Sequence, residues 1–375
     1  MGVSASERAA AVRRERSEAS LRFHQGKFRN IHPILPALRE RPPMPPILDF
    51  FFKRGARRPL APLPALDPRA ALSKPADSGL RATWLGHSTL LLEIDGARVL
   101  TDPVWSRQLS PVPVLAPKRF QPVPLQIEAL PPIDLVLISH DHFDHLDRPS
   151  IVRLARHGAA HFVTSLGVGA HLERWGVPPE RIHELEWWEE LELAGLRVTA
   201  TPSQHFSGRG LGANHTSWTS FAVHGPRHSF FFSGDTGLTT EFQDVRKRLG
   251  AFDLVMLEVG AFHPSWGDIH LGPDNALTAL EWLGGGAFLP VHWGTFDLGL
   301  HPWDEPAEQL LTAAPRRDVQ LLMPRLGEAI EPAHAQQLVP AAWWRTISAL
   351  EGREHAQQPH EPEAPQTASL PFPID

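Results

Sequence analysis

The sequence of 375 residues contains no cysteine and no tyrosine. The lack of cysteine excludes disulfides, thiolate zinc sites and a cysteine nucleophile, and the lack of tyrosine excludes a phenol as nucleophile or acid. No stretch approaches the about 18 apolar residues that a membrane-spanning helix needs. Basic residues are not in excess, because 36 Lys and Arg stand against 42 Asp and Glu and give a net charge of −6. Nucleic acid is therefore not an expected partner.

Three residue types are abundant: the chain has 38 prolines, 12 tryptophans and 21 histidines. Hydrophobic residues make up 42% of the sequence, which is enough for a large core and excludes global disorder. Histidine is the most informative of the three types, because imidazole is the commonest metal ligand in proteins.

Composition along the chain predicts four segments. Residues 1–22 form a charged N-terminal arm, a helix or a loose segment, and residues 23–80 form a proline-rich segment that packs on the core. Residues 81–345 form the main domain, and residues 346–375 form a disordered tail rich in Glu, His, Gln, Pro and Ala. The first residues are polar and lack the apolar core of a signal peptide, so we expect a cytoplasmic location.

One apolar cluster in the proline-rich segment has two interpretations. Phe50, Phe51 and Phe52 are followed directly by Lys53 and Arg54. The cluster either docks the segment onto the core or makes a peripheral contact with a membrane through its aromatic and basic side chains. The segment is also compatible with packing on a second subunit, as a homodimer.

Short apolar runs separated by helical patterns predict a layered α/β domain. Residues 89–94, the dipeptide Asp95-Gly96 and residues 98–100 have the pattern of a β-hairpin. Further strands are expected at residues 135–138, 161–164, 196–200, 229–232, 254–257 and 288–291. Apolar residues at helical spacing predict helices around residues 151–155 and 276–283, the second with Pro273 in its first turn.

The chemistry is concentrated directly after the run 135–138. Within six residues the chain places His140, His142, Asp144 and His145. In an extended segment His140 and His142 point the same way, because side chains alternate with a period of two, whereas Asp144 and His145 leave the following turn toward a second point. A structural role for three histidines at a strand end is improbable, since buried polar groups need partners. The spacing predicts two adjacent metal ions.

One segment cannot complete two coordination spheres, since a tetrahedral zinc site takes ~3–4 protein ligands. Three later strand ends supply candidates: His205, Asp235 and His292. In layered α/β folds this edge of the sheet is where sites are built.

These motifs resemble the metallo-β-lactamase superfamily, whose first motif is His-x-His-x-Asp-His. Within it, the chain is similar to the N-acyl-phosphatidylethanolamine phospholipase D group and its bacterial relatives. The likeness spans about residues 23–311 and is carried by Phe28-Arg29-Asn30, Trp84-Leu85-Gly86-His87-Ser88, Thr101-Asp102-Pro103-Val104, Pro117-Lys118-Arg119-Phe120, the His-rich motif, Gln204-His205, Ser233-Gly234-Asp235-Thr236-Gly237 and His292-Trp293-Gly294-Thr295-Phe296.

The resemblance implies an αββα sandwich with the site at one edge of two packed sheets. It implies that His140, His142 and His205 hold one metal, that Asp144, His145 and His292 hold the other, and that Asp235 bridges the two. The implied cofactors are two Zn²⁺ ions, with Mn²⁺ or Fe²⁺ as alternatives. A metal-bound hydroxide would be the nucleophile, and Asp144 would orient it or take its proton.

Three further residues are candidates around the ligands. His87 and Asp102 are each in a position to orient a ligand imidazole. Alternatively, His87 is an ordinary interior histidine and Asp102 caps a turn. By the resemblance, His270 lies at the substrate phosphate and serves in substrate binding and catalysis.

Three functions are compatible with the sequence. The first is a phosphodiesterase of phospholipase D type acting on N-acyl-phosphatidylethanolamine-like lipids. The second is a lactonase or ester hydrolase acting on a small phosphorylated substrate. This function is favoured by one difference from the animal phospholipases, in which a Gln-Tyr pair stands where this sequence has Pro113-Val114. The third is a metal-bearing scaffold without activity, which is disfavoured because every ligand position is filled.

Overall fold

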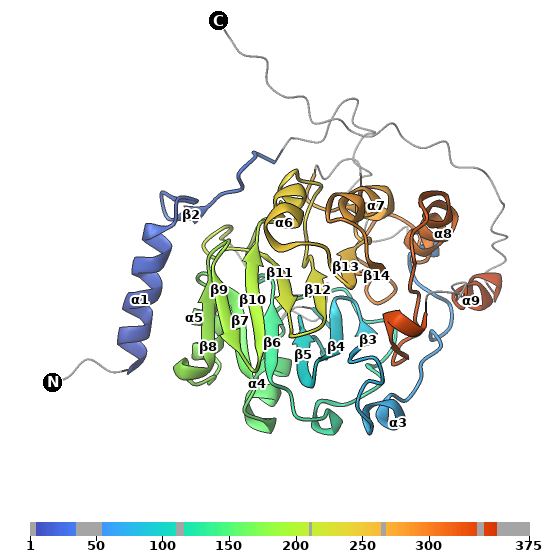
Figure 1. Cartoon of the computed structure of the whole chain (residues 1–375), viewed down its shortest axis with the longest axis horizontal. Coiled ribbons are helices and arrows are strands. Elements are labelled where there is room, and N and C mark those ends of the chain that lie inside the picture. Colours follow the sequence, from blue (N-terminus) through green and yellow to red (C-terminus); the bar gives the residue numbers. More distant parts are fainter. Residues whose placement is uncertain are drawn as a thin grey trace, which may run out of the picture.

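Two β-sheets packed face to face form the middle of the structure (Figure 1). This computed structural model describes residues 5–34, 55–109, 116–209, 212–263, 268–335 and 341–350. Helices cover the outer face of each sheet, so that the layers follow the order α, β, β, α. The predicted αββα fold class is confirmed.

The first sheet has seven strands in the order β15-β3-β4-β5-β6-β7-β8. The pairs β15–β3, β3–β4 and β4–β5 are antiparallel, and the pairs β5–β6, β6–β7 and β7–β8 are parallel. The strands are β3 (Leu80–Gly86), β4 (Thr89–Ile94), β5 (Ala97–Thr101), β6 (Leu135–Ile138), β7 (His161–Ser165), β8 (Ile182–Leu185) and β15 (Ala329–Ile330). The predicted hairpin is the β4–β5 pair.

The second sheet has six strands in the order β14-β13-β12-β11-β10-β9. Strands β12, β13 and β14 are parallel, and the remaining pairs are antiparallel. The strands are β9 (Glu190–Leu193), β10 (Leu196–Thr201), β11 (Ser220–His224), β12 (Ser229–Phe232), β13 (Leu254–Glu258) and β14 (Ala287–Val291). Each strand predicted in this part of the sequence is present, and β9 and β11 are additional.

Alternation of side chains along the strands separates two cores. In β4, Leu90 and Leu92 face the core between the sheets, while Leu91 faces the core under α4 and α5. The same alternation holds in β6, where Leu135 and Val136 point to opposite sides. Apolar residues therefore occupy both faces of the first sheet, as expected for a sheet covered on both sides.

The helices follow local sequence signals. Helix α4 begins where Asp147 accepts a hydrogen bond from Ser150 N, and α7 has Pro273 in its first turn, as predicted. Figure 1 shows α6, α7 and α8 on one side of the strands and α4 on the other. The bounds are α3 (Arg69–Leu72), α4 (Arg148–His157), α5 (Gly169–Arg174), α6 (Glu241–Leu249), α7 (Gly272–Trp282), α8 (Glu305–Ala313) and α9 (Arg345–Leu350).

The N-terminal segment docks on the β8 side of the first sheet. It contains α1 (Ala5–Ala19), β1 (Phe23–His24) and β2 (Lys27–Phe28). Arg13 Nε lies 2.5 Å from Glu184 Oε2, and the Arg22 guanidinium lies 3.4 Å from the Trp187 ring centroid. Phe28 is buried with Trp187 and Trp218. Charge pairs hold α1, whereas apolar contacts hold the residues that follow it.

The proline-rich segment contacts the core where it is described. Leu63 and Leu72 are buried, and Arg58 Nε lies 2.9 Å from Asp297 Oδ2. Phe50, Phe51 and Phe52, with Lys53 and Arg54, lie outside the described residues, as do Pro113 and Val114. Membrane contact and homodimer formation stay predictions, as does the division into four segments apart from its C-terminal boundary. Within the described ranges, no helix is long and apolar enough to cross a membrane.

The C-terminal boundary differs from the prediction. Residues 346–350, assigned to the tail, belong to α9, because Ile347 and Ser348 are buried and the Ser348 hydroxyl donates to the Asp304 carboxylate. Just before them, the Trp344 ring packs edge-on to Trp293, with centroids 5.8 Å apart. Residues 351–375 lie outside the described residues.

Trp344 should contribute strongly to stability, because its side chain is fully buried. Trp344→Ala is expected to lower the free energy of unfolding by about 3–5 kcal/mol through the cavity it leaves. Urea unfolding followed by circular dichroism measures this value. Arg345→Ala, which removes only an exposed ion pair with Glu308, should cost about 1 kcal/mol or less. Equal losses in the two variants would contradict the packing role.

Candidate metal centre

The His-rich segment, residues 140–145, follows the carboxyl end of β6, and its side chains point toward two separate groups of polar residues. Within the turn, His145 N and Leu146 N both donate to His142 O. Asp147 then begins α4, so the segment is held between a buried strand and a capped helix. His140 and His145 are buried, and the Asp144 side chain is 15% exposed.

The first group of side chains gathers around His142. His140 Nε2 lies 2.8 Å and His205 Nε2 lies 3.3 Å from His142 Nδ1. Asp235 Oδ2 lies 3.7 Å from His205 Nε2. One ligand atom from each of these four residues lies within 4.8 Å of the others, which is compact enough for a single cation.

The second group gathers around Asp144. Its Oδ2 lies 3.2 Å from His292 Nε2 and 3.4 Å from His145 Nε2. His87 also belongs to this group, with its Nε2 3.0 Å from the same oxygen. The sequence prediction placed His87 outside the ligands, and the structure brings it into contact with one of them.

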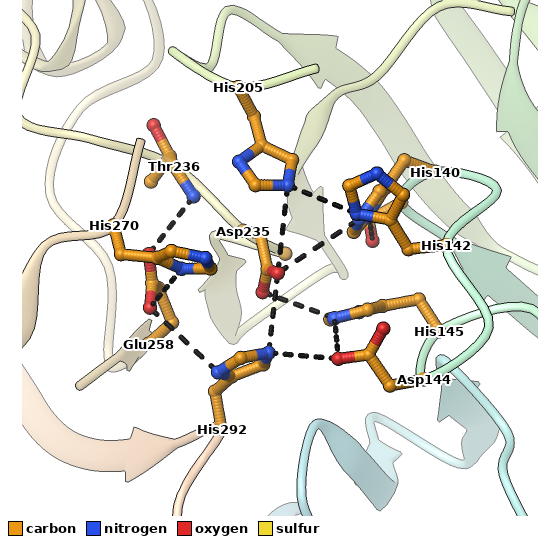
Figure 2. Close-up of polar contacts among 12 residues, drawn as sticks. His140, His142, Asp144, His145, His205, Asp235, Thr236, Glu258, His270 and His292 are labelled. Carbon is orange, nitrogen blue, oxygen red and sulfur yellow. Dashed lines mark hydrogen bonds and ion pairs between the residues drawn. The ribbon is translucent and has the colours of Figure 1, made fainter. Parts of the chain in front are cut away.

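Asp235 lies between the two groups (Figure 2). Its Oδ1 is 3.2 Å from His145 Nε2, and its Oδ2 is 3.2 Å from His292 Nε2 and 4.0 Å from His140 Nε2. A single carboxylate therefore reaches imidazoles of both groups, which is the geometry expected of a bridging residue. All seven residues predicted as ligands converge on this point.

Neighbouring acceptors determine which nitrogen of three imidazoles faces the centre. Asp102 Oδ2 lies 2.7 Å from His145 Nδ1, and the Ile269 carbonyl oxygen lies 2.9 Å from His205 Nδ1. These oxygens can only accept, so the proton is on Nδ1 in both rings. Ser139 Oγ, which donates to Asp102, similarly accepts from His140 Nδ1. The lone pairs on Nε2 are then directed inward, as in metal-binding histidines.

Asp102 contacts the start of the His-rich segment and one of its imidazoles. Its carboxylate is fully buried and accepts from Ser139 N at 2.8 Å as well as from His145. Both contacts lead into the His-rich segment, so Asp102 orients one imidazole and the start of the loop together.

Glu258 was missed by sequence reasoning. It ends β13 and is fully buried, and its carboxylate lies 3.1 Å from His270 Nδ1. It also accepts from Thr236 N and Leu271 N and lies 4.0 Å from His292 Nδ1. The sequence feature that could have identified Glu258 is its position as a charged residue directly after the apolar run 254–257. Glu258 places His270 beside the centre (Figure 2).

Ionisation in the cluster follows from burying two carboxylates among imidazoles. Burial alone would raise the pKa of Asp235, but the charges of His145 and His292 hold it well below its usual range. Burial alone would lower the pKa of His292, but the charge of Asp235 and hydrogen bonding to Asp144 raise it to about 10. The carboxylates thus stabilise positive charge at this point.

The residues suit a pair of cations. Nε2 of His145 and Oδ1 of Asp235 are buried, yet neither makes a hydrogen bond within the described part of the chain. The two atoms lie 3.2 Å apart as an ion pair without hydrogen-bond geometry, and both are lone-pair donors that would be available to bound cations. Imidazole nitrogens with carboxylate oxygens are the donor set of zinc, iron and manganese sites.

Comparison with known proteins agrees with this geometry. The model of the beta-lactamase superfamily domain matches residues 97–293. The chain belongs to the metallo-β-lactamase superfamily. A protein of Mycobacterium tuberculosis is 44% identical over 90% of this chain and 90% of its own length. The N-acyl-phosphatidylethanolamine-hydrolyzing phospholipase D 1 of Caenorhabditis elegans is 34% identical over 68% of this chain and 77% of its own length.

Solved structures show the same fold. An isothiocyanate hydrolase from gut bacteria of Delia radicum superimposes with a TM-score of 0.53 at 21% identity, over 67% of this chain and 98% of that one. The chain is therefore a metal-dependent hydrolase, as the sequence predicted.

Asp102→Asn tests the orienting contact. The amide presents an NH₂ group that competes with the bonds from His145 and Ser139, so zinc affinity should fall about 10–100-fold. Competition with a chromophoric chelator measures the affinity. Asp134→Asn makes the same chemical change at the opposite, exposed end of β6 and should leave the affinity unchanged. Equal affinities in the two variants would exclude the role given to Asp102.

Proposed function

We propose that this chain is a dinuclear phosphodiesterase of phospholipase D type that acts on N-acyl-phosphatidylethanolamine-like lipids. The observation that carries the proposal is the position of Asp235, which reaches imidazoles of both groups. The likeness to the nematode phospholipase supports the choice of substrate class. Two Zn²⁺ ions are the proposed cofactors, and Mn²⁺ or Fe²⁺ would suit the same donors.

His140, His142 and His205 would hold one ion, Asp144, His145 and His292 would hold the other, and Asp235 would contact both. The chemistry that such a pair of cations supplies is the activation of water and the polarisation of a phosphoryl oxygen. Because the Asp144 side chain is partly exposed, we assign it the task of orienting the attacking water and taking its proton.

His270 is the proposed contact to the substrate phosphate. Its ring points toward Asp235 in Figure 2, and Glu258 holds its Nδ1. Burial alone would lower the pKa of His270, but the charge and hydrogen bonds of Glu258 raise it. A protonated imidazole in this position binds a phosphate oxygen and donates a proton to the leaving oxygen.

An alternative is hydrolysis of a lactone or ester in a small phosphorylated molecule. A cavity of about 20 Å³ lies beside His292 and is lined in part by Arg57, Asp297 and His301. Arg57 is the residue of this lining that favours a phosphorylated substrate, because a guanidinium binds phosphate oxygens. The same two groups of ligands would serve this reaction.

Metal content and hydrolysis test the proposal together. We expect about two metal equivalents per chain and cleavage of both bis(p-nitrophenyl) phosphate and an N-acyl-phosphatidylethanolamine. Asp235→Ala should lower kcat/KM about a thousandfold, equivalent to about 4 kcal/mol, and reduce the bound metal. Asp244→Ala, an exposed change on α6, should alter neither.

The outcomes separate the two substrate classes. Diester turnover without lipid cleavage would overturn the phospholipid substrate and favour the small ester. No bound metal after addition of zinc or manganese would overturn the dinuclear site itself.

Glu258→Gln tests the support of His270. The amide removes the negative charge beside the imidazole, so kcat for the diester should fall about 10–100-fold while metal content stays at the wild-type value. Steady-state kinetics and metal analysis of the same preparation measure both quantities. Glu281→Gln, exposed on α7, is the matched control. A wild-type kcat in Glu258→Gln would remove His270 from the mechanism proposed.

A further inference from the structure

The N-terminal segment reaches the metal centre through one side chain. Asn30 Nδ2 donates to the His205 carbonyl oxygen at 2.7 Å, and His205 N donates to Asn30 Oδ1 at 3.1 Å. The amide therefore pairs with both backbone polar groups of a predicted ligand. These two residues are 175 positions apart in the sequence.

The backbone at His205 needs such a partner. Strand β10 ends at Thr201, and the preceding Gln204 makes only an isolated bridge to Gly237. His205 is buried, so its unpaired backbone groups would be costly. Asn30 supplies the two hydrogen bonds that a neighbouring strand would otherwise give. The imidazole is separately held by the Ile269 carbonyl.

The position of the Asn30 amide is itself determined by packing. Trp218 Nε1 donates to Asn30 Oδ1 at 3.0 Å, and Phe28 N donates to the Asn214 carbonyl at 2.7 Å. The Phe28 ring is fully buried against Trp187 and Trp218. The segment is thus held in place by Phe28 and Trp218, and its docking positions the backbone of His205.

We propose that Asn30 is a positioning residue for His205, and that residues 23–34 are in consequence a required part of the metal centre. The inference rests on the proposed role of His205 as a ligand. Loss of the amide would leave the His205 backbone free to shift, and its Nε2 would lose its alignment with His140 and His142. Contacts of this kind outside the ligand shell commonly change metal affinity about 10–100-fold.

The test uses the full chain with Asn30→Ala, Asn30→Asp and the control Arg29→Ala, whose side chain is exposed. Asn30→Asp keeps the acceptor for His205 N but replaces the donor to the carbonyl by a second oxygen. Zinc titration against a chelator should show one of two zinc equivalents bound about tenfold or more weakly in both Asn30 variants. The second equivalent, and both equivalents in Arg29→Ala, should match the wild type.

Two measurements on the metal-free protein separate positioning from general stability. Hydrogen exchange at the His205 amide should become faster in Asn30→Ala, because its acceptor is removed. The melting temperature in chelator should fall by only a few degrees, as expected when the hydrogen bonds of one side chain are lost from a chain that still folds. If Asn30→Ala does not fold, the zinc affinities of Asn30→Asp and the wild type are compared instead.

Wild-type zinc affinity at both positions in a folded Asn30 variant would overturn the inference and leave the dinuclear proposal intact. If the wild-type chain binds no metal, the dinuclear proposal fails, and hydrogen exchange at the His205 amide then decides the inference. An unchanged exchange rate in Asn30→Ala overturns the inference. A faster rate supports the positioning of the His205 backbone by Asn30.

Discussion

The buried carboxylate of Asp235 is the interaction on which the rest of the centre depends. It lies within 4.0 Å of imidazoles from the loop after β6, from the loop after β10 and from the end of β14. A buried charge of this kind is costly without compensation. The surrounding histidines supply positive charge or ligand nitrogens, and two further carboxylates orient them from behind. Asp102 holds His145, and Glu258 holds His270.

Backbone conformation shows how much the fold constrains these residues. His87, Asp102 and His292 have φ values of 57°, 30° and 67°, in the region that favours glycine. Each such residue costs of order 1–3 kcal/mol and persists only where its surroundings determine it. Here they do: His87 N donates to Thr295 Oγ1, and His292 N donates to the His87 carbonyl. Three strained positions thus lie among the polar side chains at the edge of the sandwich where the site is built.

The segments outside the sandwich contribute to the same edge. Asn30 meets the loop after β10, Arg57 and Arg58 pair with Asp297 just beyond the His292 motif, and Trp344 packs on Trp293. These three peripheral contacts therefore lie next to residues of the candidate metal centre, whereas α1 docks on the β8 side of the first sheet.

Much of this protein was determined by its sequence alone. A hairpin pattern and short apolar runs located eight strands of the two sheets, and seven ligand candidates followed from histidines and aspartates at strand ends, because apolar runs and side-chain chemistry are properties of short segments. Other features needed the tertiary structure. The buried role of Glu258, the contact of His87 with Asp144 and the pairing of Asn30 with His205 join residues that are distant in sequence, and no local pattern specifies them. The same holds for α9, whose helix depends on burial of Ile347 and Ser348 against the core. Only the packing of the sheets decides which polar side chains are buried together. Their hydrogen-bond partners and their protonation states follow from that packing.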